Sequence, residues 1–125
     1  MPKVPVIAIV DDDDSFRRAT TSFVRSLGYD AAAFDSAEAF LKSKHSREAD
    51  CLISDVQMPG MTGIELQDEL IAQGRAMPII FITAFPEMKV RAQALASGAV
   101  GILDKPFSDQ TLIKFLRKAL ATRAP

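Results

Sequence analysis

Several features that define common protein classes are scarce in this sequence of 125 residues. It has one cysteine, Cys51, and one histidine, which excludes a disulfide framework and a zinc site built from a cluster of thiolates and imidazoles. Fifteen basic and sixteen acidic residues give a net charge of −1, which argues against direct nucleic-acid binding. The lone cysteine fits a reducing compartment such as the cytoplasm.

Long apolar runs are missing as well. No segment reaches the roughly 20 apolar residues needed to span a bilayer. The apolar stretch 4–10 follows Lys3 as in a signal peptide, but Pro5 interrupts it and four aspartates follow without a small-residue cleavage site. We therefore expect a soluble, cytoplasmic protein with no membrane segment. A length of 125 residues predicts one domain over residues 1–125.

The sequence does contain a regular alternation of short apolar runs and longer amphipathic segments. The apolar runs predict β-strands at 6–10, 30–34, 51–54, 79–82 and 100–103. The amphipathic segments predict helices at about 16–27, 36–41, 62–73, 86–98 and 108–119. Ser36, Thr62 and Ser108 are predicted N-caps, and Pro86 is the predicted first residue of its helix. Five strand–helix units imply an α/β fold, a flavodoxin-like (βα)5 doubly wound parallel sheet with strand order 2-1-3-4-5.

Polar residues follow the strands at the edge where such folds bind ligands, the carboxyl ends of the strands. Asp11 and Asp12 follow the first strand, Asp55 the third, Thr83 the fourth and Lys105 the fifth. Three converging carboxylates would repel one another, and a divalent cation would relieve that repulsion. Because the ligands are all oxygen atoms, we expect Mg²⁺ or Mn²⁺, held by Asp12, Asp55, a backbone carbonyl and water.

The same residues suit phosphoryl transfer. A metal and the Lys105 ammonium would neutralise the oxygens of a phosphoryl group, and the Thr83 hydroxyl would donate to one of them. Asp55 stands alone at the end of a central strand, which makes it the candidate nucleophile for an aspartyl phosphate.

Four short motifs together make the chain similar to a known family. They are Ile9-Val10-Asp11-Asp12, Ser54-Asp55 with Met58-Pro59-Gly60, Ile82-Thr83-Ala84 and Lys105-Pro106-Phe107. Over essentially its whole length, the chain resembles the receiver domains of bacterial two-component response regulators. The runs 13–17, 36–40 and 98–100 further resemble the receivers of nitrogen-fixation regulators.

The resemblance implies a role for each residue of the site. Asp55 would be the phosphoacceptor, assisted by Thr83 and Lys105. The Mg²⁺ ligands would be Asp11, Asp12, Asp55 and the backbone carbonyl of Gln57. The Lys105–Pro106 bond would be cis.

The resemblance also implies partners and a response. A sensor histidine kinase or phosphotransfer protein would supply the phosphoryl group, and the domain would assist its own phosphorylation and dephosphorylation without otherwise being an enzyme. The surface of the fourth helix, fifth strand and last helix would then change and support a homodimer or a partner. Ile113 and Leu120 widen the apolar stripe of the last helix, which fits either a docking surface or burial under neighbouring loops. Ile102 departs from the family, which often has a rotating aromatic residue there, so an aliphatic side chain would repack instead.

Two other functions stay open on the sequence alone. Asp11-x-Asp13 distantly resembles the nucleophile and acid of haloacid-dehalogenase phosphatases, although the length leaves no cap domain and Asp55 would be idle. A degenerate receiver that only binds partners is the other.

Some polar residues have structural explanations. Asp13 and Asp14 also suit the first turn of a helix, and His45 lies in a polar stretch where we expect it to be exposed. The chain is either a stand-alone receiver or part of a longer regulator.

Overall fold

A five-stranded parallel sheet forms the centre of the computed structural model, which describes residues 4–75, 77–84, 87–105 and 107–121. The strand order is β2-β1-β3-β4-β5, which confirms the predicted topology. The strands are β1 (Val6–Val10), β2 (Asp30–Phe34), β3 (Cys51–Asp55), β4 (Ile79–Thr83) and β5 (Gly101–Asp104). All residues of β3 and β4 are buried, because these strands lie inside the sheet and both of its faces are covered.

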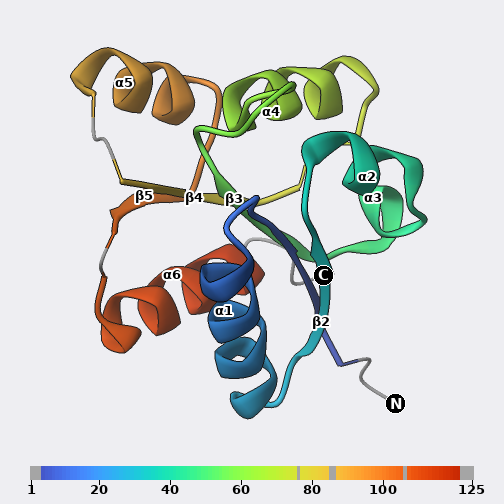
Figure 1. Ribbon diagram of the computed structural model, residues 1–125, viewed down its shortest axis with the longest axis vertical. Coiled ribbons are helices and arrows are strands. Elements are labelled where there is room, and N and C mark those ends of the chain that lie inside the picture. The colour runs from blue at the N-terminus through green and yellow to red at the C-terminus, as the bar shows by residue number, and fades with distance from the viewer. Residues whose placement is uncertain (1–3, 76, 85–86, 106, 122–125) are drawn as a thin grey trace.

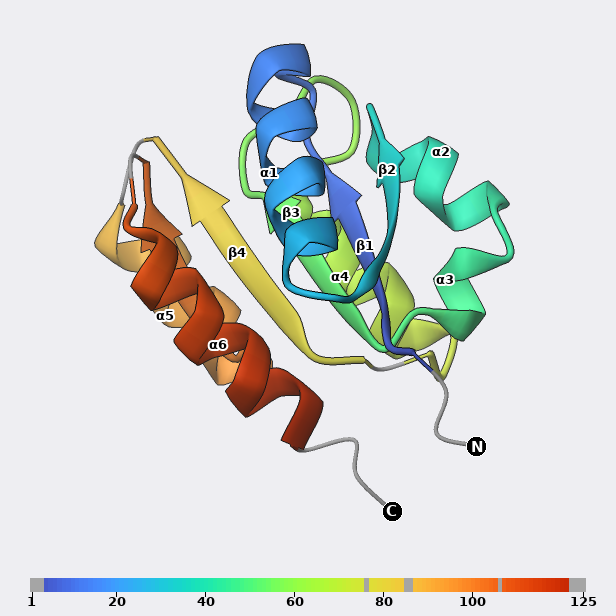
Figure 2. The ribbon, with the colours of Figure 1, turned by 90° about the horizontal axis from the view of Figure 1, so that it is seen from below.

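Helices cover both faces of the sheet (Figure 1). They are α1 (Asp14–Ser26), α2 (Ala37–Lys42), α3 (His45–Glu48), α4 (Gly63–Ala72), α5 (Met88–Ala96) and α6 (Asp109–Ala121). Figure 2 shows the face covered by α1 and α6, and the remaining helices lie on the opposite face. None of the helices in the described ranges is both long and apolar enough to cross a membrane.

The two faces of the sheet contribute side chains to two separate hydrophobic cores, because successive side chains of a strand point to opposite faces. In β1, Ile7 and Ile9 pack in the core beneath α1 and α6, whereas Ala8 and Val10 pack in the core beneath α2, α4 and α5. A continuous apolar run therefore serves both cores at once. This is why the run at 6–10 predicted a strand buried on both faces.

The predicted N-caps are confirmed, whereas the first helix begins at Asp14, before its predicted start near residue 16, because the Asp13 side chain caps it. Ser36 and Thr62 cap α2 and α4, and Thr62 forms a complete capping box with Glu65. Ser108 Oγ accepts a hydrogen bond from the backbone of the first turn of α6. The predicted helix start at Pro86 lies outside the described residues, and α5 spans Met88–Ala96.

One segment differs from the prediction. The polar stretch after α2 contains a second short helix, α3, so that the region between β2 and β3 holds two helices instead of one. This helix turns His45 inward, where it is half-buried and its ring lies 6.0 Å from that of Phe34. The expectation that His45 is exposed is therefore wrong, because this helical turn buries Ser46 and Ala49 and places the His45 ring beside Phe34.

Candidate functional site

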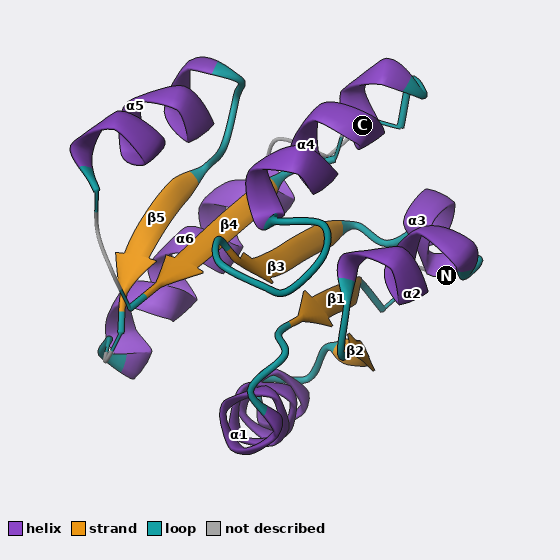
Figure 3. Ribbon diagram, turned by 45° about the horizontal axis from the view of Figure 1, so that its top comes forward, coloured by secondary structure: helices purple, strands orange, loops and turns teal. Residues whose placement is uncertain are grey.

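The candidate site lies where β1, β3, β4 and β5 end at one edge of the sheet. Figure 3 shows these strands pointing to the same edge, with the loop between β3 and α4 passing over it. The register sets Asp55 opposite Ile82, so Thr83 extends one residue beyond it on the neighbouring strand. The parallel topology thus brings together residues that are far apart in the sequence.

Three carboxylates converge at this edge, as predicted. Oxygen atoms of Asp11, Asp12 and Asp55 lie within 4.8 Å of one another. Asp11 and Asp55 are buried, whereas Asp12 is exposed. Backbone N–H groups hold the two buried carboxylates: Asp13 donates to Asp11 Oδ1 at 2.9 Å, and Gln57 donates to Asp55 Oδ1 at 3.2 Å.

Lys105 joins two of these carboxylates. Its Nζ lies 3.2 Å from Asp55 Oδ2 and 3.3 Å from Asp11 Oδ2. The Lys105 backbone N–H donates to the carbonyl oxygen of Thr83 at 2.8 Å. This hydrogen bond holds the residue that follows β5 against the end of β4. The predicted approach of Lys105 to Asp55 is therefore present in the folded chain.

Burial and charge shift the protonation of this pair in ways that matter for chemistry. Burial is the largest influence on Asp55, and with the Asp11 carboxylate it raises the pKa of Asp55 above 3.8, although Lys105 and the Gln57 N–H oppose the rise. For Lys105, burial lowers the pKa, but the Asp55 and Asp11 carboxylates together outweigh burial and raise it above 10.5. Lys105 therefore remains an ammonium ion at physiological pH.

The donor set fits a hard divalent cation. Lys105 pairs with two of the three carboxylates, so the cluster keeps an excess of negative charge that a cation would neutralise. The donors are oxygen atoms, which Mg²⁺ and Mn²⁺ prefer. One carboxylate is exposed, which suits an ion that keeps several water ligands.

The remaining predicted residues take these positions. Thr83 is buried at the end of β4, and Gln57 is exposed just after β3. Ile102 is half-buried and packs against the core beneath α2, α4 and α5. The predicted cis bond before Pro106 lies outside the described residues.

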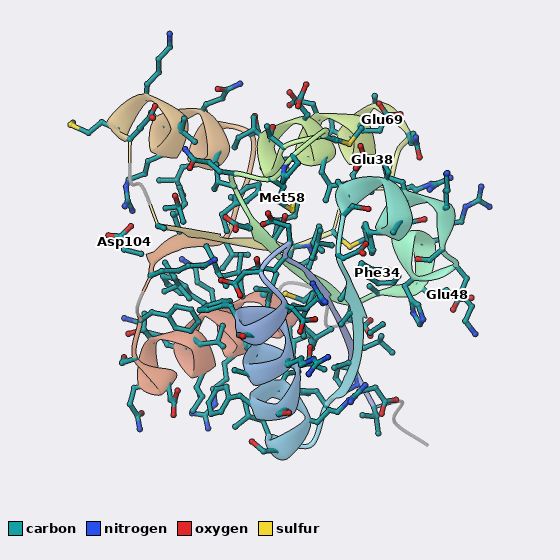
Figure 4. All side chains as sticks on the ribbon, in the orientation of Figure 1. Phe34, Glu38, Glu48, Met58, Glu69 and Asp104 are labelled. Atoms are coloured by element: carbon teal, nitrogen blue, oxygen red, sulfur yellow. The ribbon has the colours of Figure 1, made fainter. Side chains whose placement is uncertain are left out.

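Three residues at the site were not identified from the sequence. Arg17 Nη1 donates to the backbone carbonyl of Asp11 at 2.8 Å, and the Phe16 ring lies beneath the Lys105 ammonium. Glu38 reaches from α2 to the loop between β3 and α4, where its Oε2 accepts from Met61 N at 3.2 Å (Figure 4). The helical spacing of Phe16 marked it only as a core residue, and its place in the first turn after Asp12 was the available signal for a site role.

Comparison with known proteins agrees with this geometry. A family model described as response regulator receiver domain matches residues 7–117. Response regulator protein TmoT of Ectopseudomonas mendocina is 40% identical over 115 residues, which cover 92% of this chain and 52% of that protein. Transcriptional regulatory protein FixJ of Azorhizobium caulinodans is 34% identical over 124 residues, which cover 99% of this chain and 59% of that protein.

A solved structure gives the same result. The crystal structure of a response regulator receiver protein from Burkholderia phymatum is 43% identical, with a TM-score of 0.79 over 94% of this chain and 95% of that chain. The chain spans about half the length of the curated relatives it matches. The matched residues 7–117 include all of the side chains that converge at the strand ends. The chain therefore belongs to the response regulator receiver domain family of two-component systems.

Proposed function

We propose that residues 1–125 form one receiver domain that accepts a phosphoryl group on Asp55 from the phosphohistidine of a sensor histidine kinase or phosphotransfer protein. The observation that carries this proposal is the position of Lys105 Nζ, 3.2 Å from Asp55 Oδ2, beside two further carboxylates. Because the ammonium already contacts the acceptor carboxylate, it can bind the oxygens of a phosphoryl group that is transferred to that carboxylate.

The proposed reaction is an in-line displacement. Asp55 attacks phosphorus with a carboxylate oxygen, a P–O bond forms, the P–N bond to the histidine breaks, and its electron pair returns to the imidazole. Lys105 and the Thr83 hydroxyl stabilise the charge on the phosphoryl oxygens. Asp11, Asp12, Asp55 and the Gln57 carbonyl would hold Mg²⁺, whose charge supports both this transfer and the later hydrolysis of the acyl phosphate.

The proposed response spreads through β4, β5 and the helices beside them. Thr83 ends β4, and Ile102 of β5 packs within the adjacent core, so movement of Thr83 toward a phosphoryl group would let Ile102 repack. Met88 is 86% exposed, which leaves an apolar side chain in solvent at the start of α5. We propose that the phosphorylated form uses the surface of α5, β5 and α6 for a homodimer or an output partner.

Of the two residues that widen the apolar stripe of α6, Ile113 and Leu120, only Ile113 supports this surface. Among the described residues, Ile113 is half-buried but belongs to neither core. Leu120 instead packs against the core beneath α1 and α6. Ile113 is therefore the residue to test in the proposed interface, and Leu120 has a packing role.

The haloacid-dehalogenase alternative has no support at the atomic level. The Asp13 side chain, which would be the acid in that reaction, accepts a hydrogen bond from Phe16 N and caps α1.

The alternative of a degenerate receiver, which would bind partners without being phosphorylated, is tested by phosphate uptake. Wild type and Lys105→Ala would be incubated with acetyl phosphate, with and without Mg²⁺, and resolved on a phosphate-affinity gel. We expect Mg²⁺-dependent uptake that is several-fold slower in Lys105→Ala, and no uptake in wild type would favour a binding-only module.

A further inference from the structure

We propose that Phe16 is a positioning residue for phosphoryl transfer, because its ring holds the Lys105 ammonium at the acceptor carboxylate. This inference rests on the proposed role of Asp55. It assigns a role to a side chain outside the four motifs at the strand ends. Phe16 would act through Lys105 and would not touch the phosphoryl group.

The ammonium of Lys105 has three fixed neighbours. Its Nζ lies 4.3 Å from the centroid of the Phe16 ring, 3.2 Å from Asp55 Oδ2 and 3.3 Å from Asp11 Oδ2. The negative face of an aromatic ring attracts a cation most strongly when water is excluded, and the Lys105 side chain is only 16% exposed. Geometry and burial therefore both favour a cation–π interaction that contributes to the site.

The ring is itself held from two sides. The backbone N–H of Phe16 donates to the Asp13 carboxylate at 3.1 Å, which anchors Phe16 in the first turn of α1. The rings of Phe16 and Phe107 meet edge to face, with centroids 5.7 Å apart and planes at 72°. Phe107 lies two residues after Lys105, so one aromatic pair joins the segments on both sides of the ammonium.

Transfer of a phosphoryl group changes only one of these three contacts. When Asp55 becomes an acyl phosphate, Lys105 must exchange a carboxylate oxygen for a phosphoryl oxygen, while Asp11 and the Phe16 ring remain in place. A free lysine side chain loses considerable rotamer entropy when it is fixed. The ring reduces that loss, because it restricts Nζ to the region of the acceptor before and after transfer.

The ring of Phe16 contributes both to packing and to the surroundings of the Lys105 ammonium. Beside the ring lies a cavity of about 160 Å³ between α1 and α6, lined by Phe16, Phe23, Phe107 and residues of both helices. A leucine would fill the same apolar wall with less volume and no π face. A leucine would therefore alter the contact with Phe107 as well as the contact with Lys105, and only the second of these depends on the charge of the lysine.

The test compares phosphorylation rates of Phe16→Leu and Phe16→Tyr with acetyl phosphate and Mg²⁺. We expect the second-order rate constant to fall roughly three- to tenfold in Phe16→Leu, the range for a partly desolvated cation–π contact. Phe16→Tyr keeps a ring face and should stay within about twofold of wild type. Phe23→Leu, in the same helix and the same cavity wall, is the matched control and should also stay within about twofold.

A double-mutant cycle shows whether Phe16 acts through Lys105. In a Lys105→Met background, Phe16→Leu should cause no further loss of rate, whereas a purely structural role predicts the same loss in both backgrounds. An independent reading comes from NMR of the wild-type protein, in which the ring should shift the Lys105 Hε protons upfield. Wild-type rates in Phe16→Leu, an undiminished loss in the Lys105→Met background or unshifted Hε protons would each overturn the inference. Failure of wild type to form phospho-Asp55 would instead overturn the proposed function.

Discussion

Replacing Gly63 with alanine is expected to destabilise the protein and to displace Asp55. Gly63 is the first residue of α4, and its N–H donates to the carbonyl oxygen of Val56 at 2.8 Å. A Cβ atom there would overlap the backbone oxygen of Asp55 and would lie 3.1 Å from Val56 Cα and 3.0 Å from Phe81 Cε1. Glycine is thus needed for the close approach of α4 to the end of β3.

Two opposing terms set the magnitude. Alanine is favoured over glycine by up to about 1 kcal/mol inside a helix, and by less at its first residue. Overpacking of a core typically costs about 1–3 kcal/mol, and two of the three overlapped atoms belong to the backbone, so no side-chain rotation relieves them. The overlap prevails, and we expect a net destabilisation of about 0.5–2.5 kcal/mol. For a domain of this size that lowers Tm by roughly 2–10 °C.

Urea denaturation followed by circular dichroism measures this change, with Gly101→Ala as the matched control. At Gly101 the three atoms nearest to a Cβ all belong to the ring of Phe115, so a side-chain movement could relieve the overlap and the loss of stability should be smaller. Gly63→Ala should also weaken Mg²⁺ binding and phosphate uptake, because the backbone of Asp55 must shift, whereas Gly101→Ala should retain both. A Gly63→Ala variant as stable as wild type would refute the reasoning.

Three further predictions concern the charge of Asp55, the metal site and the surface of α5, β5 and α6. In metal-free buffer, Asp55→Asn should be more stable than wild type near neutral pH, because burial and Asp11 raise the pKa of the folded carboxyl. Ionised Asp55 then opposes folding, so this advantage should vanish below pH 3.8, the ordinary value, grow as the pH rises above it and level off once the folded carboxyl is fully ionised; a pH-independent difference in urea denaturation would contradict the assignment. Mg²⁺ at about 100 times its Kd should stabilise wild type by about 2.7 kcal/mol but leave the Tm of Asp12→Ala nearly unchanged; equal shifts would remove Asp12 from the metal site. In sedimentation experiments, beryllofluoride should promote self-association or partner binding of wild type but not of Ile113→Glu, and identical behaviour of all samples would exclude this surface.

The strands were predictable from the sequence because burial on both faces leaves continuous apolar runs. Val6–Val10, which is almost wholly buried, occurs as β1 with the predicted bounds. Asp30–Phe34 is a weaker apolar run because β2 is an edge strand with exposed and half-buried residues, yet its bounds are also as predicted. The region around α3 was not predictable, because a four-residue helix has no room for the 3.6-residue repeat that identifies longer helices. His45 therefore looked like part of a polar loop, although the folded chain turns it toward Phe34.

The convergence of Asp11, Asp12, Asp55 and Lys105 was also predictable, because parallel topology brings strand ends to one edge. The surroundings of these residues were not. Phe16 has the spacing of a core residue, and only the folded chain shows that its ring faces an ammonium. Contacts between side chains at the ends of different elements depend on rotamers and close approach, and sequence periodicity carries no information about either.

The central claim is that Asp55 accepts the phosphoryl group, and mass spectrometry of the protein treated with acetyl phosphate and Mg²⁺ tests it most directly. Because acyl phosphates hydrolyse, borohydride reduction would convert the modified residue to a stable homoserine before digestion. We predict one modified position, residue 55, with no modification in Asp55→Asn and normal modification in Asp104→Asn, an exposed carboxylate at the end of β5 (Figure 4). Modification at another aspartate in wild type, or undiminished modification in Asp55→Asn, would contradict the account.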